Sequence, residues 1–134
     1  MMTFKRDKFL LKTLKTLSGL QELRKDHVPN FLSFTQVLII WNDIERQIPK
    51  NFTNVVEKLN LTVHFIHPPM NSINNRFAFF NKIDTDCVLQ LDDDLKTSHK
   101  ELKFMFRAWR EERDRLVSFV PRRRIVDAKT GLGK

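Results

Sequence analysis

The sequence is poor in cysteine, glycine and proline. Its 134 residues include one cysteine, Cys87, so an internal disulfide and a zinc site built on several cysteines are excluded. The three glycines and five prolines are too few for a fibrous or low-complexity chain. No apolar run approaches the roughly 20 residues that span a bilayer. The length fits a single domain.

The sequence also lacks tyrosine, and its charges are unequal. Lys and Arg number 24 against 16 Asp and Glu, which gives a formal net charge of +8. Such a chain attracts anions, including nucleic acids, acidic membranes and phosphorylated small molecules. The arginines at 122–124 allow a basic nucleic-acid-binding module as one alternative. However, the 12 phenylalanines fall mostly in apolar stripes and leave few stacking platforms, so we expect no nucleic acid partner.

Helical and strand patterns alternate along the chain. Apolar residues recur at helical spacing over residues 8–20 and 52–59 and again after Ser98. Short apolar runs predict buried strands, with a further strand ending near the start of the chain. The predicted strands are 2–4, 37–41, 62–66, 87–91 and 116–120. This order predicts an α/β fold with a mostly parallel sheet, in which ligands bind at the carboxyl ends of the strands.

Three adjacent aspartates, Asp92, Asp93 and Asp94, follow the predicted strand at 87–91. Three carboxylates repel one another, and a divalent ion such as magnesium or manganese, which prefers carboxylate oxygens and bridges to phosphate, would compensate them. In an extended segment Asp92 and Asp94 point to one side and Asp93 to the other. The pattern therefore predicts a metal site on Asp92 and Asp94. The alternative is an acidic loop that caps the helix after Ser98.

A second polar motif, NSINNR at residues 71–76, precedes a short apolar helical face. The guanidinium of Arg76 can bind phosphate through two hydrogen bonds, and asparagine amides can pair with a base edge or a sugar hydroxyl. The alternative is a turn in which asparagine bonds to its own backbone. Asn42 and Asp43 follow the strand at 37–41 and allow the same two interpretations.

Several motifs, in order, resemble the exostosin-like glycosyltransferase domain, glycosyltransferase family 64. They are VLIIWN at 37–42, NSINNRF at 71–77 and IDTDCVLQLDDD at 83–94. The segments TFKRD at 3–7, ELKF at 101–104, RAWR at 107–110 and DRLVSFVPR at 114–122 are also similar. The resemblance covers nearly the whole chain.

The resemblance implies a GT-A fold, which is Rossmann-like, with residues 1–134 as the donor-nucleotide-binding half of one domain. It implies transfer of an N-acetylhexosamine from a UDP-sugar, UDP-GlcNAc or UDP-GalNAc, with Mn²⁺ and retention of the anomeric configuration. The implied acceptor is a glycan, such as a heparan-sulfate-type chain, or a glycolipid. The implied location is the lumen of the endoplasmic reticulum or Golgi, where full-length members are held at the membrane by an anchor.

The resemblance also assigns roles to individual residues. Those implied to bind uridine diphosphate (UDP) are Arg6, Asn42, Asn71, Asn75 and Arg76. Asp92 and Asp93 are implied to contact the ribose or the donor sugar. Asp94 is implied to coordinate manganese, and Asp92 lies on the same side.

The family domain continues for roughly another hundred residues, a length in keeping with ordinary domain sizes. We therefore expect this chain to be a copy truncated at both ends, without the acceptor half. The catalytic acidic residue and a second arginine are expected in that half, so no catalytic residue is assigned. A non-catalytic fragment that binds only UDP is the alternative to an enzyme, and nothing in the sequence indicates an oligomeric state.

Overall fold

The structure is a computed structural model that describes residues 1–22, 34–94 and 96–118. The chain divides into two compact units, Met1–His99 and Lys100–Lys134. The first unit contains the sheet and every residue of the candidate site that the sequence singled out.

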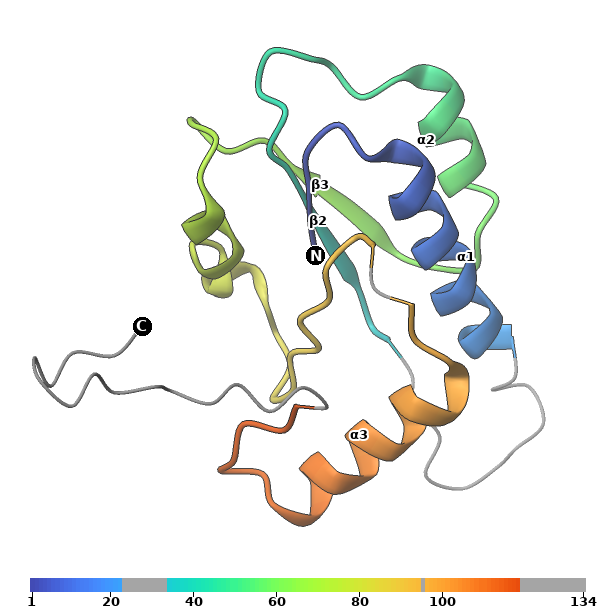
Figure 1. Cartoon of the computed structure of the whole chain (residues 1–134), viewed down its shortest axis with the longest axis vertical. Coiled ribbons are helices and arrows are strands. Elements are labelled where there is room, and N and C mark those ends of the chain that lie inside the picture. Colours follow the sequence, from blue (N-terminus) through green and yellow to red (C-terminus); the bar gives the residue numbers. More distant parts are fainter. Residues whose placement is uncertain (23–33, 95, 119–134) are drawn as a thin grey trace, which may run out of the picture. The chain divides into compact units, whose positions relative to one another are not determined.

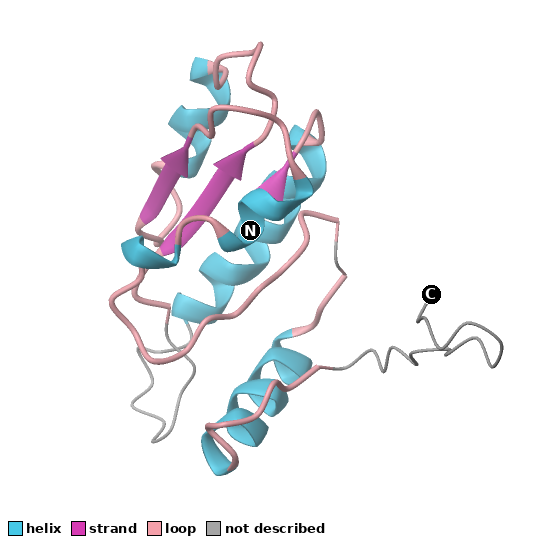
Figure 2. Cartoon of the chain, turned by 90° about the vertical axis from the view of Figure 1, so that its left-hand side faces the viewer, coloured by secondary structure: helices cyan, strands magenta, loops and turns pink. Residues whose placement is uncertain are grey.

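The sheet has three parallel strands in the order β1-β2-β3. They are β1 (Met2–Thr3), β2 (Val37–Trp41) and β3 (Val63–Ile66), and Figure 2 shows them pointing the same way. The central strand β2 is apolar throughout, as expected for a parallel strand covered on both faces. The strands predicted at 37–41, 62–66 and 2–4 are confirmed to within one residue at each end.

Two helices form the crossovers between these strands. Helix α1 (Asp7–Glu22) joins β1 to β2, and α2 (Lys50–Val56) joins β2 to β3. Both connections step across the sheet in the same direction, so right-handed crossovers place both helices on one face, where they pack together (Figure 1). The helices predicted at 8–20 and 52–59 are thus confirmed with shifted ends.

The core lies between these helices and the sheet. Leu10, Leu14 and Leu17 of α1 are buried at the spacing of one helical face. Phe52 of α2 packs between two aromatic side chains of the sheet, Trp41 and Phe65, with ring centroids 6.2 Å apart in each pair. Burial of these apolar side chains fixes the carboxyl ends of the strands, which carry the site.

After β3 the chain forms two short 3-10 helices, η2 (Ile73–Phe77) and η3 (Phe80–Lys82). They lie on the side of the sheet opposite α1 and α2 (Figures 1 and 2). The short helix expected within residues 71–80 is therefore present, but as 3-10 turns.

The strand predicted at residues 87–91 is wrong. This segment makes no ladder with the sheet, and its nearest pairing is one parallel bridge between Met2 and Asp92. The adjacent strand β1 has only two residues and offers almost no backbone for a ladder. Val88 is therefore exposed and Cys87 only half-buried, rather than both lying in a buried strand.

The helix expected after Ser98 is α3 (His99–Glu111). Within the second unit, residues 116–118 form no strand and Leu116 is exposed, so that part of the predicted strand at 116–120 is wrong. Residues 119–120 and the arginines at 122–124 lie outside the described residues. No helix in the described segments combines the length and the apolar character needed to cross a bilayer.

Candidate functional site

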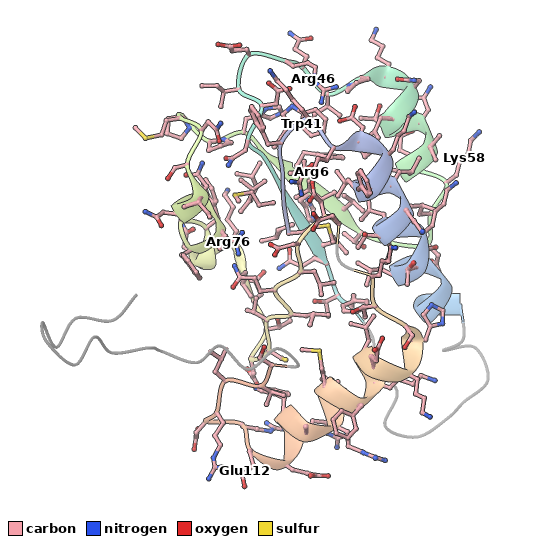
Figure 3. The ribbon with its side chains drawn as sticks, viewed as in Figure 1. Arg6, Trp41, Arg46, Lys58, Arg76 and Glu112 are labelled. Atoms are coloured by element: carbon pink, nitrogen blue, oxygen red, sulfur yellow. The ribbon has the colours of Figure 1, made fainter. Side chains whose placement is uncertain are left out.

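Four segments bring polar side chains to the carboxyl edge of the sheet. They are the turn after β1, the end of β2, the η2 segment and the acidic residues 92–94. Figure 3 shows Arg6 near the strand ends and Arg76 on the η2 side of the sheet. Ligands of parallel α/β sheets bind at this edge.

The three aspartates alternate in direction. The side chain of Asp93 is buried, with 6% of its surface exposed, whereas those of Asp92 and Asp94 are 54% and 47% exposed. The sequence predicted opposite directions for Asp93 and its neighbours from an extended chain, but in the structure Asp93 and Asp94 form a turn, and the turn is what buries Asp93 and leaves its neighbours exposed. Two carboxylates therefore face outward on either side of a buried one.

Asp93 is held from inside the fold. Its carboxylate accepts a hydrogen bond from Thr3 Oγ1 at 2.7 Å, and Arg6 Nη1 lies 3.5 Å from its second oxygen. Its backbone carbonyl accepts a bond from Thr13 Oγ1 at 2.9 Å. The carboxylate is turned toward Thr3 instead of outward, so the contact with ribose or donor sugar implied for Asp93 stays a prediction.

Each outward carboxylate is paired with one arginine. Arg6 Nη1 lies 2.5 Å from Asp94 Oδ2, and Arg76 Nη2 lies 3.1 Å from Asp92 Oδ1. Arg76 Nε is buried and has no hydrogen-bond partner. The guanidinium of Arg76 therefore retains an unused donor next to the acidic residues.

A metal ion fits this cluster only together with another ligand. Asp92 and Asp94 supply hard carboxylate oxygens, but nowhere in the described segments do three Asp, Glu, His or Cys side chains converge as a ready metal set. Magnesium-like ions commonly take one or two carboxylates and complete their shell with phosphate oxygens and water. The two outward aspartates match that pattern.

The asparagines lie in a different environment from the aspartates. Asn42 and Asn75 are buried, and Asn75 Nδ2 donates to Asn42 Oδ1 and to Met70 O, both at 2.7 Å. Asn42 Nδ2 donates to Ser72 O at 3.0 Å. These bonds hold the segment before Arg76 against the end of β2. The UDP contacts implied for Asn42, Asn75 and the exposed Asn71 stay predictions.

A second ionic cluster at the same edge was missed by the sequence reasoning. Arg46 donates to both oxygens of Asp7, at 2.8 and 2.7 Å, and to Asp43 Oδ2 at 2.9 Å. Its guanidinium lies 4.8 Å from the ring centroid of Trp41, whose Nε1 donates to Arg46 O at 2.8 Å. The only sequence signal is the three-residue spacing between Asp43 and Arg46.

This second cluster shifts the pKa values of Asp7 and Arg46. Hydrogen bonds from Arg46 hold the pKa of the Asp7 carboxyl below its ordinary value. The bonds to Asp7 and Asp43 raise the pKa of Arg46. The cluster joins the start of α1 to the loop after β2, on which Asn42 lies.

Residues 1–132 match the family model described as the glycosyl transferase family 64 domain. The chain belongs to this family. The match confirms the predicted exostosin-like resemblance. Together with the parallel three-stranded sheet flanked by helices, it also confirms the expected GT-A-like, Rossmann-like α/β fold. Membership makes the chain part of a glycosyltransferase family.

Similar curated proteins come from animals and plants. The Exostosin-like-3 homolog of Caenorhabditis elegans is 34% identical over 122 residues, which are 91% of this chain and 13% of that protein. Human Exostosin-like 2 is 30% identical over 125 residues, 93% of this chain and 34% of that protein. Glucosamine inositolphosphorylceramide transferase 1 of Oryza sativa subsp. japonica is 31% identical over 97 residues, 72% of this chain and 12% of that protein. The chain spans at most 34% of the length of these three relatives.

Proposed function

We propose that this chain binds the UDP moiety of a nucleotide sugar at the carboxyl edge of its sheet, as the donor side of a glycosyltransferase. The observation that supports this most directly is the meeting of two arginines and two outward carboxylates from separate segments. Arg6 follows β1, Arg76 belongs to η2, and Asp92 and Asp94 come from the acidic triplet. Arginines bind diphosphate oxygens, and the carboxylates bind the cation that accompanies a diphosphate.

The charges of the cluster argue for a cation as part of the ligand. Two guanidinium groups face three carboxylates, so these five side chains together carry one net negative charge. A divalent cation on Asp94 and Asp92 reverses that sign. We therefore propose Mn²⁺ as the cofactor, with Asp94 as its direct ligand.

Binding the diphosphate requires the arginines to leave their aspartate partners at least in part. Both pairs are partly solvent-exposed. Exposed ion pairs are worth only about 0.2–1 kcal/mol each, so their exchange for phosphate oxygens costs little. The buried Nε of Arg76 has no partner, so a rearrangement of this side chain toward a phosphate oxygen gives up no bond at that atom.

In the reaction we propose, the chain's own arginines stabilise the leaving group. Arg6 and Arg76 would donate hydrogen bonds to the diphosphate as negative charge develops on the departing UDP. When bound, Mn²⁺ would supply further Lewis-acid stabilisation of that charge. No catalytic acidic residue is assigned among the described residues.

The finer assignment rests on family membership. We propose an N-acetylhexosamine donor, UDP-GlcNAc or UDP-GalNAc, transfer with retention, and a glycan or glycolipid acceptor in the lumen of the endoplasmic reticulum or Golgi. The rice relative is called a glucosamine inositolphosphorylceramide transferase, which supports a hexosamine donor and a lipid acceptor. The heparan-sulfate-type alternative rests on the exostosin-like resemblance alone.

Calorimetric titration with UDP, in the presence and absence of Mn²⁺, tests the binding. We expect binding with Mn²⁺ and little without it. Asp94→Asn should weaken binding at least tenfold, on the order of 1.4 kcal/mol or more. Asp114→Asn, at an exposed aspartate of the second unit, is the matched control and should leave the affinity unchanged.

Two results would contradict the proposal. Absence of UDP binding in Mn²⁺ would overturn the donor site itself. Equal affinity with and without Mn²⁺, unchanged in Asp94→Asn, would overturn the metal role alone. Release of UDP from UDP-GlcNAc or UDP-GalNAc in the presence of an acceptor would distinguish an enzyme from a chain that only binds UDP.

A further inference from the structure

The acidic triplet is positioned by side chains and not by a strand ladder. Residues 87–91 make no ladder with the sheet, and the triplet's one pairing is the bridge between Asp92 and Met2. Asp93 is nevertheless buried. Something other than backbone pairing therefore holds this segment in place.

Thr13 of α1 supplies one of these contacts. Its side chain is buried, and its hydroxyl donates to the backbone carbonyl of Asp93, 80 positions away, at 2.9 Å. Thr16, three residues on, shows the usual behaviour of a helical threonine, because its hydroxyl donates to Lys12 O within the same helix. Thr13 instead directs its hydroxyl away from its own helix to the triplet.

Thr3 of β1 supplies the other contact. Its hydroxyl donates to Asp93 Oδ2 at 2.7 Å, and both atoms are buried. Asp93 is thus held at its side chain by the sheet and at its backbone by α1. Two attachment points on one residue restrict its rotation as well as its position.

We propose that Thr3 and Thr13 are positioning residues for the donor site, a role that rests on the proposed function. Asp93 is buried between two exposed neighbours in a short turn, so holding Asp93 inward keeps both Asp92 and Asp94 outward. In that direction Asp92 meets Arg76 and Asp94 meets Arg6. Asp93 itself then serves as the anchor of the triplet.

The test uses Thr13→Val, which keeps the shape of the side chain and leaves the buried carbonyl of Asp93 without this partner. Thr16→Val is the matched control in the same helix, and Thr13→Ser restores the hydroxyl. The first measurement is backbone amide exchange of residues 91–94 in the ligand-free protein, with β2 as the reference. Thr13→Val should speed this exchange about tenfold relative to β2, and the other two variants should not.

The second measurement is UDP affinity in Mn²⁺. Thr13→Val should weaken it about tenfold, with wild-type affinity in Thr16→Val and recovery in Thr13→Ser. Thr3→Val should act in the same direction as Thr13→Val, because it leaves the buried carboxylate of Asp93 without its shortest bond.

The outcomes separate this inference from the proposed function. Unchanged exchange at residues 91–94 in Thr13→Val would overturn the anchor, whether or not UDP binds. If Thr13→Val speeds exchange at residues 91–94 but leaves UDP affinity unchanged, the positioning role of Thr13 is overturned. An equal increase in exchange rate at residues 91–94 and in β2 would also overturn it, because the effect would then not be local to the triplet. Wild-type protein that fails to bind UDP in Mn²⁺ would instead overturn the proposed function, and the positioning role would fall with it.

Discussion

Two arginines at the same edge of the sheet have opposite surroundings. Arg46 donates three hydrogen bonds of 2.7–2.9 Å to two carboxylates and stacks on Trp41. Arg76 makes one 3.1 Å contact with Asp92, and its Nε is buried without a partner. The guanidinium of Arg46 makes three hydrogen bonds within the fold, and that of Arg76 makes one.

This difference separates a structural cluster from a binding cluster of the same residue types. Arg46 would lose three bonds if it turned to a ligand, whereas Arg76 would exchange only one partly exposed pair. We therefore expect Arg46 to govern stability and Arg76 to govern nucleotide affinity. The same substitution at both positions tests this expectation.

The largest effect is expected for Arg46→Gln. The change removes the charged partner of Asp43, whose side chain is only 4% exposed, so the free energy of unfolding should fall by about 2–3 kcal/mol. Urea unfolding measures this loss. Arg115→Gln is the control because Arg115 pairs with Glu112 at an exposed site, and it should cost less than about 0.5 kcal/mol. Equal losses in the two variants would mean that Arg46 is no more structural than Arg115.

The next effect is expected for Arg76→Gln, in binding instead of stability. Loss of a charged donor to phosphate should weaken UDP affinity in Mn²⁺ about tenfold. The free energy of unfolding should change by less than about 1 kcal/mol, because the pair with Asp92 is partly exposed. Calorimetry measures the UDP affinity, and urea unfolding of the same samples measures the free energy of unfolding. If Arg76→Gln lowers the free energy of unfolding but leaves UDP affinity unchanged, Arg76 is a structural residue and not a nucleotide-binding one.

The sequence predicted the parts of the fold that depend on local pattern. Leu10, Leu14 and Leu17 predicted α1 because their spacing alone defines the buried face. The apolar run of β2 likewise predicted a strand covered on both sides. Residues 87–91 had a similar apolar run but no ladder, because a strand also needs a neighbour of sufficient length and β1 has two residues.

In the candidate site, too, features that depend on neighbouring residues were predictable, and contacts between distant positions were not. The exposure of Asp92 and Asp94 around a buried Asp93 agrees with the prediction, but the predicted cause was wrong, because Asp93 and Asp94 form a turn and not an extended segment. The contact of Asp7 with Arg46 joins positions 39 apart, and that of Thr13 with Asp93 joins positions 80 apart. No local pattern encodes such pairings, so both contacts were missed.

A smaller effect is expected from the pH dependence of the Arg46 cluster. The pKa of Asp7 lies below its ordinary value of 3.8 because Arg46 donates hydrogen bonds to the carboxylate. The folded state thus holds the charged form more strongly than the unfolded state, and this stabilisation is present above the ordinary pKa and lost as the pH falls through the folded pKa. Asp7→Asn should cost about 1 kcal/mol near pH 6, and the difference from wild type should shrink toward pH 3.

Urea unfolding at several pH values measures this difference, and the double variant with Arg46→Gln is its control. Because Arg46 is the main cause of the lowered pKa, Asp7→Asn should have almost no pH-dependent effect once Arg46 is replaced. A pH-dependent difference that persists in the Arg46→Gln background would assign the effect to another partner of Asp7.

The smallest effect is expected for the turn at Lys5, which precedes Arg6 of the aspartate cluster and Asp7 of the Arg46 cluster. Lys5 has a φ of 56°, and the next two residues diverge, with Arg6 bonded to Asp94 and Asp7 bonded to Arg46. A left-handed conformation costs a residue with a side chain roughly 1–2 kcal/mol, which glycine avoids at some cost in unfolded-state entropy. Lys5→Gly should therefore raise the free energy of unfolding by up to about 1 kcal/mol and leave UDP affinity unchanged.

Lys15→Gly, the same replacement at an exposed position inside α1, should instead lower the free energy of unfolding by about 1 kcal/mol. Urea unfolding of the two variants measures these changes in the free energy of unfolding, which we expect to have opposite signs. A loss of stability in Lys5→Gly as large as that in Lys15→Gly would mean that the lysine side chain stabilises this turn more than its backbone conformation costs. Reduced UDP affinity in Lys5→Gly would mean that a rigid left-handed residue is needed to hold Arg6 near Asp94.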